Sequence, residues 1–382
     1  MKNFIPLLVP CLNGNEKKYL SECVESTYVS SAGKFIEKFE NKIQQITNSS
    51  YVTTLNSGTS ALHLSLIDAG VKSNDLVITS NYTFIATANA INYCGADPVL
   101  IDVDGSSFNI NFDLVEKFME TECELVDGCY IHIDSKRRVS AFLPVMALGN
   151  MLPSDDLSLF KKKYSIPIIL DAAAGIGSHS ASKKLGELTF DYATLSFNGN
   201  KTITCGAGGA ILTPKNNARL RHLAATARKH PTYLHDEVGY NYRITNTCAA
   251  IGLAQIELLD EIKIKKNRIY NFYKNNLSSP NFTFYDEGFE QSSCKWLSGF
   301  RLNDENIKDI ENFVLHLNER GIGASKFWEP LSEQAMFKNS INLLDSTAKK
   351  ISDSFIVLPS SPDLKDAELE YIVKTIIGYW NK

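Results

Sequence analysis

The first 250 residues of this 382-residue chain alternate between strand-like runs and helix-like runs. Alternation of this kind predicts a mostly parallel sheet with helices on both faces, because parallel strands need crossover helices between them. The predicted strands are Tyr51–Leu55, Leu76–Ser80, Pro98–Val103, Ile166–Leu170, Ala193–Phe197 and Gly209–Thr213, and the helices predicted among them are Thr59–Ala69 and Ile85–Tyr93.

The pattern changes near Asn246. The stretch from Cys248 to Lys274 predicts one long helix, and the last hundred residues mix short strands and helices. We therefore expect a large α/β domain over residues 1–260 and a smaller α+β domain over residues 261–382. A long helix at such a boundary often belongs to both domains.

Composition excludes several classes of protein. Hydrophobic residues make up 44% and charged residues 21%, as in globular proteins. The net charge of −4 argues against a nucleic-acid partner, which usually requires a basic surplus. No apolar run is long enough for a membrane span or a signal peptide, so we expect a cytoplasmic protein. The eight cysteines include no C-x-x-C pair, which favours reduced thiols and argues against a metal site.

One short segment combines a strand end with a helix start. The run from Asn56 to Leu62 follows a β-branched strand, and Ser57, Gly58 and Thr59 stand where the helix begins. Free backbone N–H groups and the helix dipole make such a place suitable for an anion. The alternative interpretation is an ordinary helix cap supplied by a serine.

Two further strand ends carry charged side chains. Asp171 ends the apolar run Ile168–Leu170 and precedes three alanines, where it could hold a ring proton or simply cap the next element. Lys201 follows the turn Ser196–Asn200, where partial desolvation would make its amine nucleophilic, although most lysines lie in solvent. Phosphate anchor, pyridinium partner and lysine are the three parts that pyridoxal 5′-phosphate (PLP) requires.

At this point the chain resembles the DegT/DnrJ/EryC1/StrS family of PLP-dependent sugar aminotransferases, which have the fold type I architecture with a seven-stranded type of sheet. The resemblance runs over essentially the whole chain, and its SFNGNK and GYNYR pieces are quite specific. The matching stretches are YVSSAG (28–33), NSGTSAL (56–62), YTFIATANA (82–90), DAAAGIGS (171–178), SFNGNKTITCGAGG (196–209) and GYNYR (239–243).

The resemblance implies a role for each matching residue. Lys201 corresponds to the Schiff-base lysine and Asp171 to the partner of the pyridine nitrogen, and these two are the implied catalytic residues. The other implied cofactor-binding residues are Ser57, Gly58, Thr59, Phe84 (stacked on the ring), Ser196, Asn198 and Asn241. The implied substrate-binding residues are Ser31, Arg243 and Trp328, and for Trp328 core packing is the alternative. Asn241 and Arg243 would reach the neighbouring subunit's site, so a homodimer with shared active sites is expected.

The resemblance also implies a reaction. Glutamate would give its amino group to C4 of a nucleotide-linked 4-keto-6-deoxy sugar through PLP and pyridoxamine 5′-phosphate. HDEVGYNYR (235–243) looks most like enzymes that use UDP-linked N-acetyl sugars in the bacillosamine and legionaminic acid pathways of surface glycans. GDP- or dTDP-keto sugars, aminated at C3 or C4, are the alternatives.

Two other functions remain open on the same scaffold. A PLP-dependent sugar dehydratase would carry histidine in place of Lys201, so this lysine argues against it. A catalytically silent regulatory protein would bind PLP without turnover. One departure from the family pattern stands at Ala174, where a polar residue usually lies near the phenolic oxygen of PLP.

Overall fold

The computed structural model describes residues 4–180, 183–286 and 291–380. Its centre is a sheet built from two hydrogen-bonded groups of strands, in the orders β1-β11-β10-β7 and β18-β3-β2-β6. Parallel bridges from Phe142 to Ile168 and from Val145 to Asp171 place β6 beside β7 and so join the two groups. Strand β11 is antiparallel to both neighbours, whereas the other pairs are parallel. The prediction of a mostly parallel sheet is confirmed.

The strands of this sheet alternate with helices along the chain. The strands are β1 (Tyr51–Leu55), β2 (Leu76–Ser80), β3 (Asp97–Ile101), β6 (Val139–Leu143), β7 (Ile169–Asp171), β10 (Tyr192–Ser196), β11 (Gly209–Thr213) and the short β18 (Asn342–Leu343). The helices of this part are α1 (Glu16–Glu25), α2 (Lys34–Thr47), α3 (Gly58–Asp68), α4 (Ala86–Tyr93), α5 (Phe112–Thr121), α6 (Ser154–Tyr164), α7 (Ala218–Ala224) and α8 (Asn246–Glu257).

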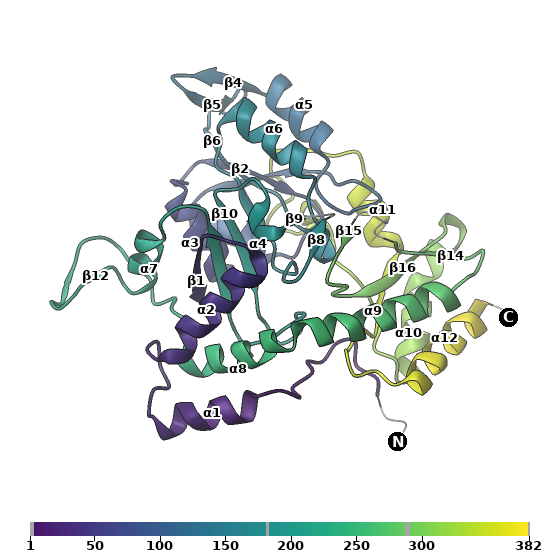
Figure 1. Cartoon of the computed structure of the whole chain (residues 1–382). Helices are drawn as coiled ribbons and strands as arrows, with labels where there is room; N and C mark the ends of the chain where they lie inside the picture. Colours follow the sequence, from purple (N-terminus) through teal and green to yellow (C-terminus); the bar gives the residue numbers. More distant parts are fainter. Residues whose placement is uncertain (1–3, 181–182, 287–290, 381–382) are drawn as a thin grey trace.

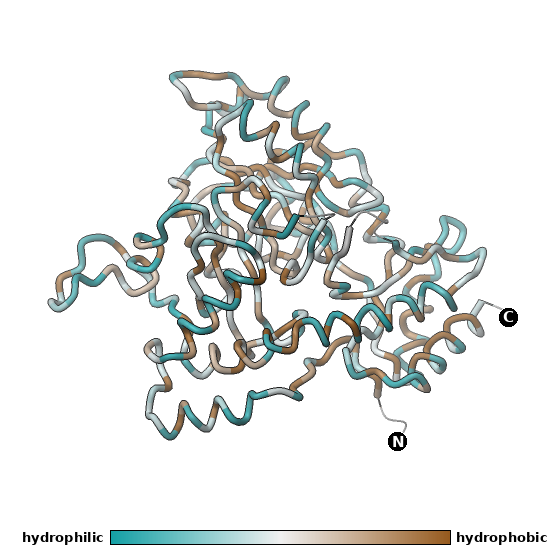
Figure 2. The backbone as a smooth tube through the Cα atoms, viewed as in Figure 1, coloured by the Kyte–Doolittle hydropathy of each residue, from teal (hydrophilic) through white to brown (hydrophobic). Residues whose placement is uncertain are grey.

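The two faces of the sheet carry separate apolar cores. Successive residues of a strand point to opposite faces, so Leu76 and Ile78 join one cluster and Val77 joins the other. Helices α2, α5, α6 and α8 pack on the first face, and α3, α4 and α7 pack on the second. Figure 2 shows hydrophilic and hydrophobic residues alternating along the outer helices, as expected for helices with one buried face.

The carboxyl-terminal part has its own sheet and core. Its antiparallel sheet has the order β14 (Phe282–Phe284), β16 (Ser298–Leu302), β19 (Phe355–Leu358) and β17 (Ser325–Lys326). The carboxyl-terminal core includes side chains of helices α9 (Leu259–Asn276), α10 (Ile310–Glu319) and α12 (Asp366–Trp380), and α11 (Thr347–Ser354) packs nearby (Figure 1).

The predicted long helix is two helices, and the second one contributes to a core of the large sheet and to the carboxyl-terminal core. The chain turns at Leu258, between α8 and α9. Ile262 of α9 lies in the core on the first face of the large sheet, whereas Ile269 and Tyr273 lie in the carboxyl-terminal core. The amino-terminal Ile5 also packs in the carboxyl-terminal core. The domain boundary near residue 260 stays a prediction.

Short elements decorate this frame. The hairpin of β12 (Arg228–Lys229) and β13 (Leu234–His235) projects from the body (Figure 1). The remaining short strands are β4 (Cys123–Val126), β5 (Cys129–His132), β8 (His179–Ser180), β9 (Lys183–Lys184) and β15 (Gln291–Ser292), and the 3-10 helices are Ala147–Gly149, Leu185–Glu187, Asp304–Asp309 and Leu331–Glu333. Among the residues that the structure describes, no helix is both long enough and apolar enough to cross a membrane.

Candidate active site

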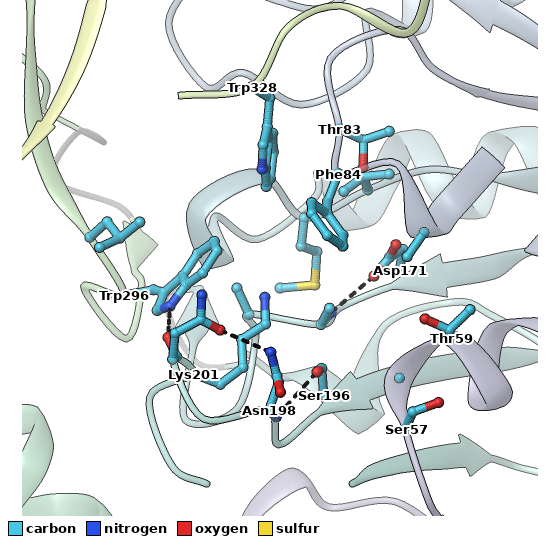
Figure 3. Close-up of a pocket in the computed structure, with 18 of the residues that line it drawn as sticks. Ser57, Thr59, Thr83, Phe84, Asp171, Ser196, Asn198, Lys201, Trp296 and Trp328 are labelled. Carbon is cyan, nitrogen blue, oxygen red and sulfur yellow. Dashed lines mark hydrogen bonds between the residues drawn. The ribbon is translucent and has the colours of Figure 1, made fainter. Parts of the chain in front are cut away.

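The carboxyl ends of neighbouring strands meet around one cavity of about 520 Å³. Asp171 ends β7, Ser196 ends β10, and the loops after β1 and β2 supply further walls. In open α/β sheets this edge is where ligands bind. The carboxyl-terminal part closes the opposite side with Trp296, Phe327 and Trp328. Figure 3 shows Trp296 and Trp328 on one side of this space and Asp171 and Ser196 on another.

The first turn of α3 forms one end of the cavity. Ser57 is the N-cap, and its Oγ accepts a hydrogen bond of 3.0 Å from the amide of Ser60. The capping interpretation is therefore correct for the Ser57 hydroxyl. The amides of Gly58 and Thr59 lie in the first turn, where N–H groups have no intrahelical partner and face an anion favourably.

Gly58 is required for this approach between helix and strand. A Cβ at Gly58 would lie 2.9 Å from Cβ of Ser196, closer than side chains tolerate. The helix start therefore lies directly against the end of β10. Because Ser196 and Thr59 both line the cavity there, hydroxyl groups and free amides surround the same small volume.

Asp171 is a buried carboxylate held in a fixed orientation. Its Oδ2 accepts a hydrogen bond of 2.7 Å from Thr87 Oγ1, and its Oδ1 accepts one of 3.1 Å from the amide of Ala173. Thr87 in turn lies 2.9 Å from Thr83 Oγ1. Burial raises the pKa of Asp171, while these two hydrogen bonds and the charge of Lys201 oppose that rise.

Lys201 presents an amine in a desolvated place. Its backbone N–H donates to the carbonyl of Asn198, which closes the turn after β10. Burial lowers the pKa of the Lys201 amine to about 8, although the nearby Asp171 and Cys294 favour the charged form. An amine with such a pKa exchanges protons readily near neutral pH.

Aromatic side chains form the remaining walls. The Phe84 ring is 58% exposed at the mouth of the cavity, which leaves its face available to a flat ligand. Trp328 stacks on Phe327, with ring centroids 4.2 Å apart, and also contacts Tyr82 edge-on. Trp328 therefore packs against aromatic neighbours and also lines the cavity. Its contact with a substrate stays a prediction.

The structure brings most of the predicted site residues together. Those that line the cavity are Ser57, Gly58, Thr59, Phe84, Asp171, Ser196, Asn198, Lys201 and Trp328. Ser31 and Arg243 line a different cavity of about 530 Å³, which also contains Glu40 and Arg221. Asn241 is exposed and lies beside Asn56, next to the loop that leads into α3.

The glycine and the aromatic residues of GYNYR (239–243) are typical of a projecting loop, but the structure holds this segment against the sheet. Asn241 forms a backbone bridge with Ala225, and Arg243 forms one with Leu55 at the end of β1. These contacts hold the segment along the sheet edge, and the part that projects is the preceding hairpin. Within the described residues, the buried Nε of Arg243 has no hydrogen-bond partner.

Sequence reasoning missed two residues of this site. Thr87 lay in a matching stretch, but only the structure reveals that its hydroxyl holds Asp171. Trp296 lies 95 positions beyond Lys201 in the chain, and its ring centroid is 3.8 Å from Lys201 Nζ. No local pattern could indicate either contact. Ala174 lines the cavity as expected, and its carbonyl accepts a hydrogen bond from Cys294 Sγ at 2.9 Å.

The residues of the cavity fit PLP. The start of α3 offers amides and hydroxyls to a phosphate, the buried Asp171 can pair with a protonated ring nitrogen, and Lys201 offers an amine. A metal is not needed for this chemistry. Within residues 4–180, 183–286 and 291–380, no group of three or more His, Cys, Asp or Glu side chains could hold a metal ion.

Known proteins resemble this chain over almost its whole length. The model of the DegT/DnrJ/EryC1/StrS aminotransferase family matches residues 10–377. A GDP-perosamine synthase of Vibrio cholerae is 32% identical over 387 residues and 99% of both chains. A UDP-4-amino-4,6-dideoxy-N-acetyl-beta-L-altrosamine transaminase of Campylobacter jejuni is 28% identical over 367 residues, covering 93% of this chain and 92% of that one.

Solved structures share the fold. Helicobacter pylori PseC, an aminotransferase involved in the biosynthesis of pseudoaminic acid, superimposes with a TM-score of 0.88 at 21% identity, over 99% of this chain and 100% of that one. A putative sugar aminotransferase of Streptococcus pneumoniae in its PMP form gives 0.86 at 21% identity, over 97% and 98%. The chain therefore belongs to the DegT/DnrJ/EryC1/StrS aminotransferase family and is a PLP-dependent sugar aminotransferase.

Proposed function

We propose that this enzyme transfers the amino group of glutamate to C4 of a nucleotide-linked 4-keto-6-deoxy sugar. The observation that carries the proposal is the meeting of three groups in one cavity, namely the Lys201 amine, the Asp171 carboxylate and the first turn of α3. These groups suit an amine-transfer cofactor, and the aromatic wall with Trp328 leaves room for a sugar beside it.

The cofactor would be held at both ends. Gly58 and Thr59 amides, with the Ser57 and Ser196 hydroxyls and Asn198 nearby, would hold the phosphate, and Phe84 would lie against the ring. Bound PLP supplies an electron-accepting ring for the bond that breaks at the donor's Cα. Asp171, fixed by Thr87 and the Ala173 amide, would hold a proton on the ring nitrogen.

Lys201 would move the proton in both half-reactions. A group that acts first as base and then as acid works best with a pKa near the operating pH. Burial brings the pKa of Lys201 to about 8, which meets this requirement. Asn198 holds the Lys201 backbone by the 3.0 Å bond to its N–H, so the amine is delivered from a fixed turn.

Two nucleotides have support. The sequence pattern HDEVGYNYR favours a UDP-linked 2-acetamido-4-keto-2,6-dideoxy sugar, which would place the enzyme in bacillosamine or legionaminic acid synthesis for surface glycans. The relatives named GDP-perosamine synthase are 30–32% identical and favour a GDP-linked sugar instead. The Campylobacter transaminase, whose name carries UDP, is 28% identical.

A substrate panel tests the proposal. Purified enzyme with PLP and glutamate should form more than one equivalent of 2-oxoglutarate per active site only when a 4-keto nucleotide sugar is present. Mass spectrometry should then find the matching amino sugar. GDP-, UDP- and dTDP-linked 4-keto-6-deoxy sugars form the panel, and the Lys201→Arg variant is the control. Turnover of 3-keto sugars alone, or of none, would contradict the C4 assignment.

We further propose that the active site is shared between two subunits. Asn241 and Arg243 would act in the neighbour's site, which agrees with their position outside the cavity of their own chain. Arg243 offers a planar fork suited to a diphosphate or a carboxylate, and its buried Nε has no partner among the described residues. A two-fold dimer would place each Arg243 symmetrically.

Mixing two inactive variants tests this arrangement. Lys201→Ala and Arg243→Ala subunits, after exchange, should regain roughly a quarter of wild-type activity, because about half the dimers are mixed and each has one intact site. Subunit exchange is verified separately with differently tagged chains. Proven exchange without recovery would place Arg243 in its own subunit's site or outside any site.

A further inference from the structure

Trp296 lies directly against the reactive amine. Its ring centroid is 3.8 Å from Lys201 Nζ, close enough for a cation–π interaction with the charged amine (Figure 3). The indole N–H donates a hydrogen bond of 2.6 Å to the carbonyl of Asn200, the residue immediately before Lys201. The same side chain therefore contacts the lysine's amine and fixes the backbone from which that lysine extends.

Trp296 is also held from behind. Its backbone carbonyl accepts a hydrogen bond of 3.0 Å from Lys266 Nζ, and the same amine donates another of 3.0 Å to the carbonyl of Ser360. Lys266 is only 2% exposed and Trp296 only 4%. Phe327 packs edge-on against the indole, with ring centroids 6.0 Å apart. The indole N–H is bonded to Asn200 and the Trp296 backbone to Lys266, so the buried side chain is held in one orientation.

We propose that Trp296 is a positioning residue that holds the protonated Lys201 amine against its ring face during the part of the cycle when this amine is free. The inference rests on the proposed role of Lys201 and adds to it. In this role, a residue of the carboxyl-terminal part of the chain directly contacts and orients the Lys201 amine that would move the proton.

The groups around Lys201 make the ring's contribution measurable. Asp171 and Cys294 are the titratable groups that face the amine, and both favour its charged form, whereas burial disfavours it. The π face of Trp296 adds to the stabilisation of the charged form. Loss of the ring at constant burial should therefore lower the pKa of Lys201 by about half a unit to one unit, the size of a partly desolvated cation–π contact.

The experiment measures this pKa in the holoenzyme. In the form carrying pyridoxamine 5′-phosphate, Lys201 is a free amine, and its rate of trace acetylation by acetic anhydride can be followed by peptide mass spectrometry against pH. Trp296→Phe and Trp296→Leu both remove the N–H and open similar space, but only phenylalanine keeps a π face. We expect a lower Lys201 pKa in the leucine variant than in the phenylalanine variant.

A variant of unchanged shape covers the case in which leucine disturbs folding. Tetrafluorotryptophan at position 296 keeps the indole volume and the bond to Asn200 but removes the negative potential of the ring face. It should lower the Lys201 pKa, whereas the same residue at Trp380, which packs against Phe313, should leave it unchanged. Equal pKa values for wild-type and fluorinated enzyme would overturn the inference. Failure of the proposed function would instead appear as no cofactor on Lys201 at all.

Discussion

Replacing Lys201 with alanine is expected to lower turnover by about 1,000-fold or more, because the chain loses both its nucleophilic amine and its proton carrier. Steady-state formation of 2-oxoglutarate from glutamate measures the loss. Circular dichroism should show an unchanged fold, because the Lys201 side chain lines the cavity and its loss only enlarges a space that is already open.

A second buried lysine makes the assignment testable. Burial lowers the pKa of Lys266 to about 8, as it does for Lys201. Both Lys266 hydrogen bonds go to backbone carbonyls, so its amine is committed to structure. Borohydride treatment of the holoenzyme should attach the cofactor to the peptide with Lys201, and Lys266→Met should keep that label. A label on the Lys266 peptide would contradict our assignment. So would a folded Lys266→Met variant in which the Lys201 peptide no longer carries the label.

The strands of the large sheet were predictable because their residues are buried on both faces. Tyr51–Leu55, Leu76–Ser80 and Gly209–Thr213 have the predicted bounds, since turn residues flank each apolar run. The predicted Ile166–Leu170 was less accurate. Strand β7 begins at Ile169 and includes Asp171, because pairing with β10 and not hydrophobicity decides where that strand ends.

The site residues that lie at strand ends could be predicted from the local sequence. Ser57 and Lys201 follow strands β1 and β10, and Asp171 is the last residue of β7. The shared edge of the sheet therefore brings the three together. The break at Leu258 was not predictable, because apolar residues continue at helical spacing through it and tertiary packing sets the change of direction. The contact of Trp296 with Lys201 was equally inaccessible, since 95 positions separate the two residues in the chain.

The second large effect concerns Asp171. Asp171→Asn keeps the size of the side chain but removes the charge that would hold a proton on the ring nitrogen, and it leaves one acceptor oxygen where the carboxylate has two. Turnover should fall by roughly 100- to 1,000-fold, the range for loss of one preorganised electrostatic partner. Presteady-state absorbance after glutamate addition would locate the loss in the first half-reaction. Wild-type turnover in this variant would show that Asp171 only caps the following residues.

Thr87 provides the matched control for this prediction. Its hydroxyl donates to the charged form of Asp171, so Thr87→Val should raise the pKa of the buried carboxyl further, while Thr87→Ser should not. With a raised pKa, Asp171 becomes protonated at a higher pH as the pH falls. An enzyme that needs the charged carboxylate therefore loses activity at that higher pH. The acid limb of the kcat/KM profile should therefore move to higher pH in the valine variant and stay in place in the serine variant. An unmoved limb in both variants, together with an inactive Asp171→Asn, would mean that Asp171 acts without help from Thr87. The backbone amide of Ala173 and the charge of Lys201 would then be enough to keep its carboxylate charged.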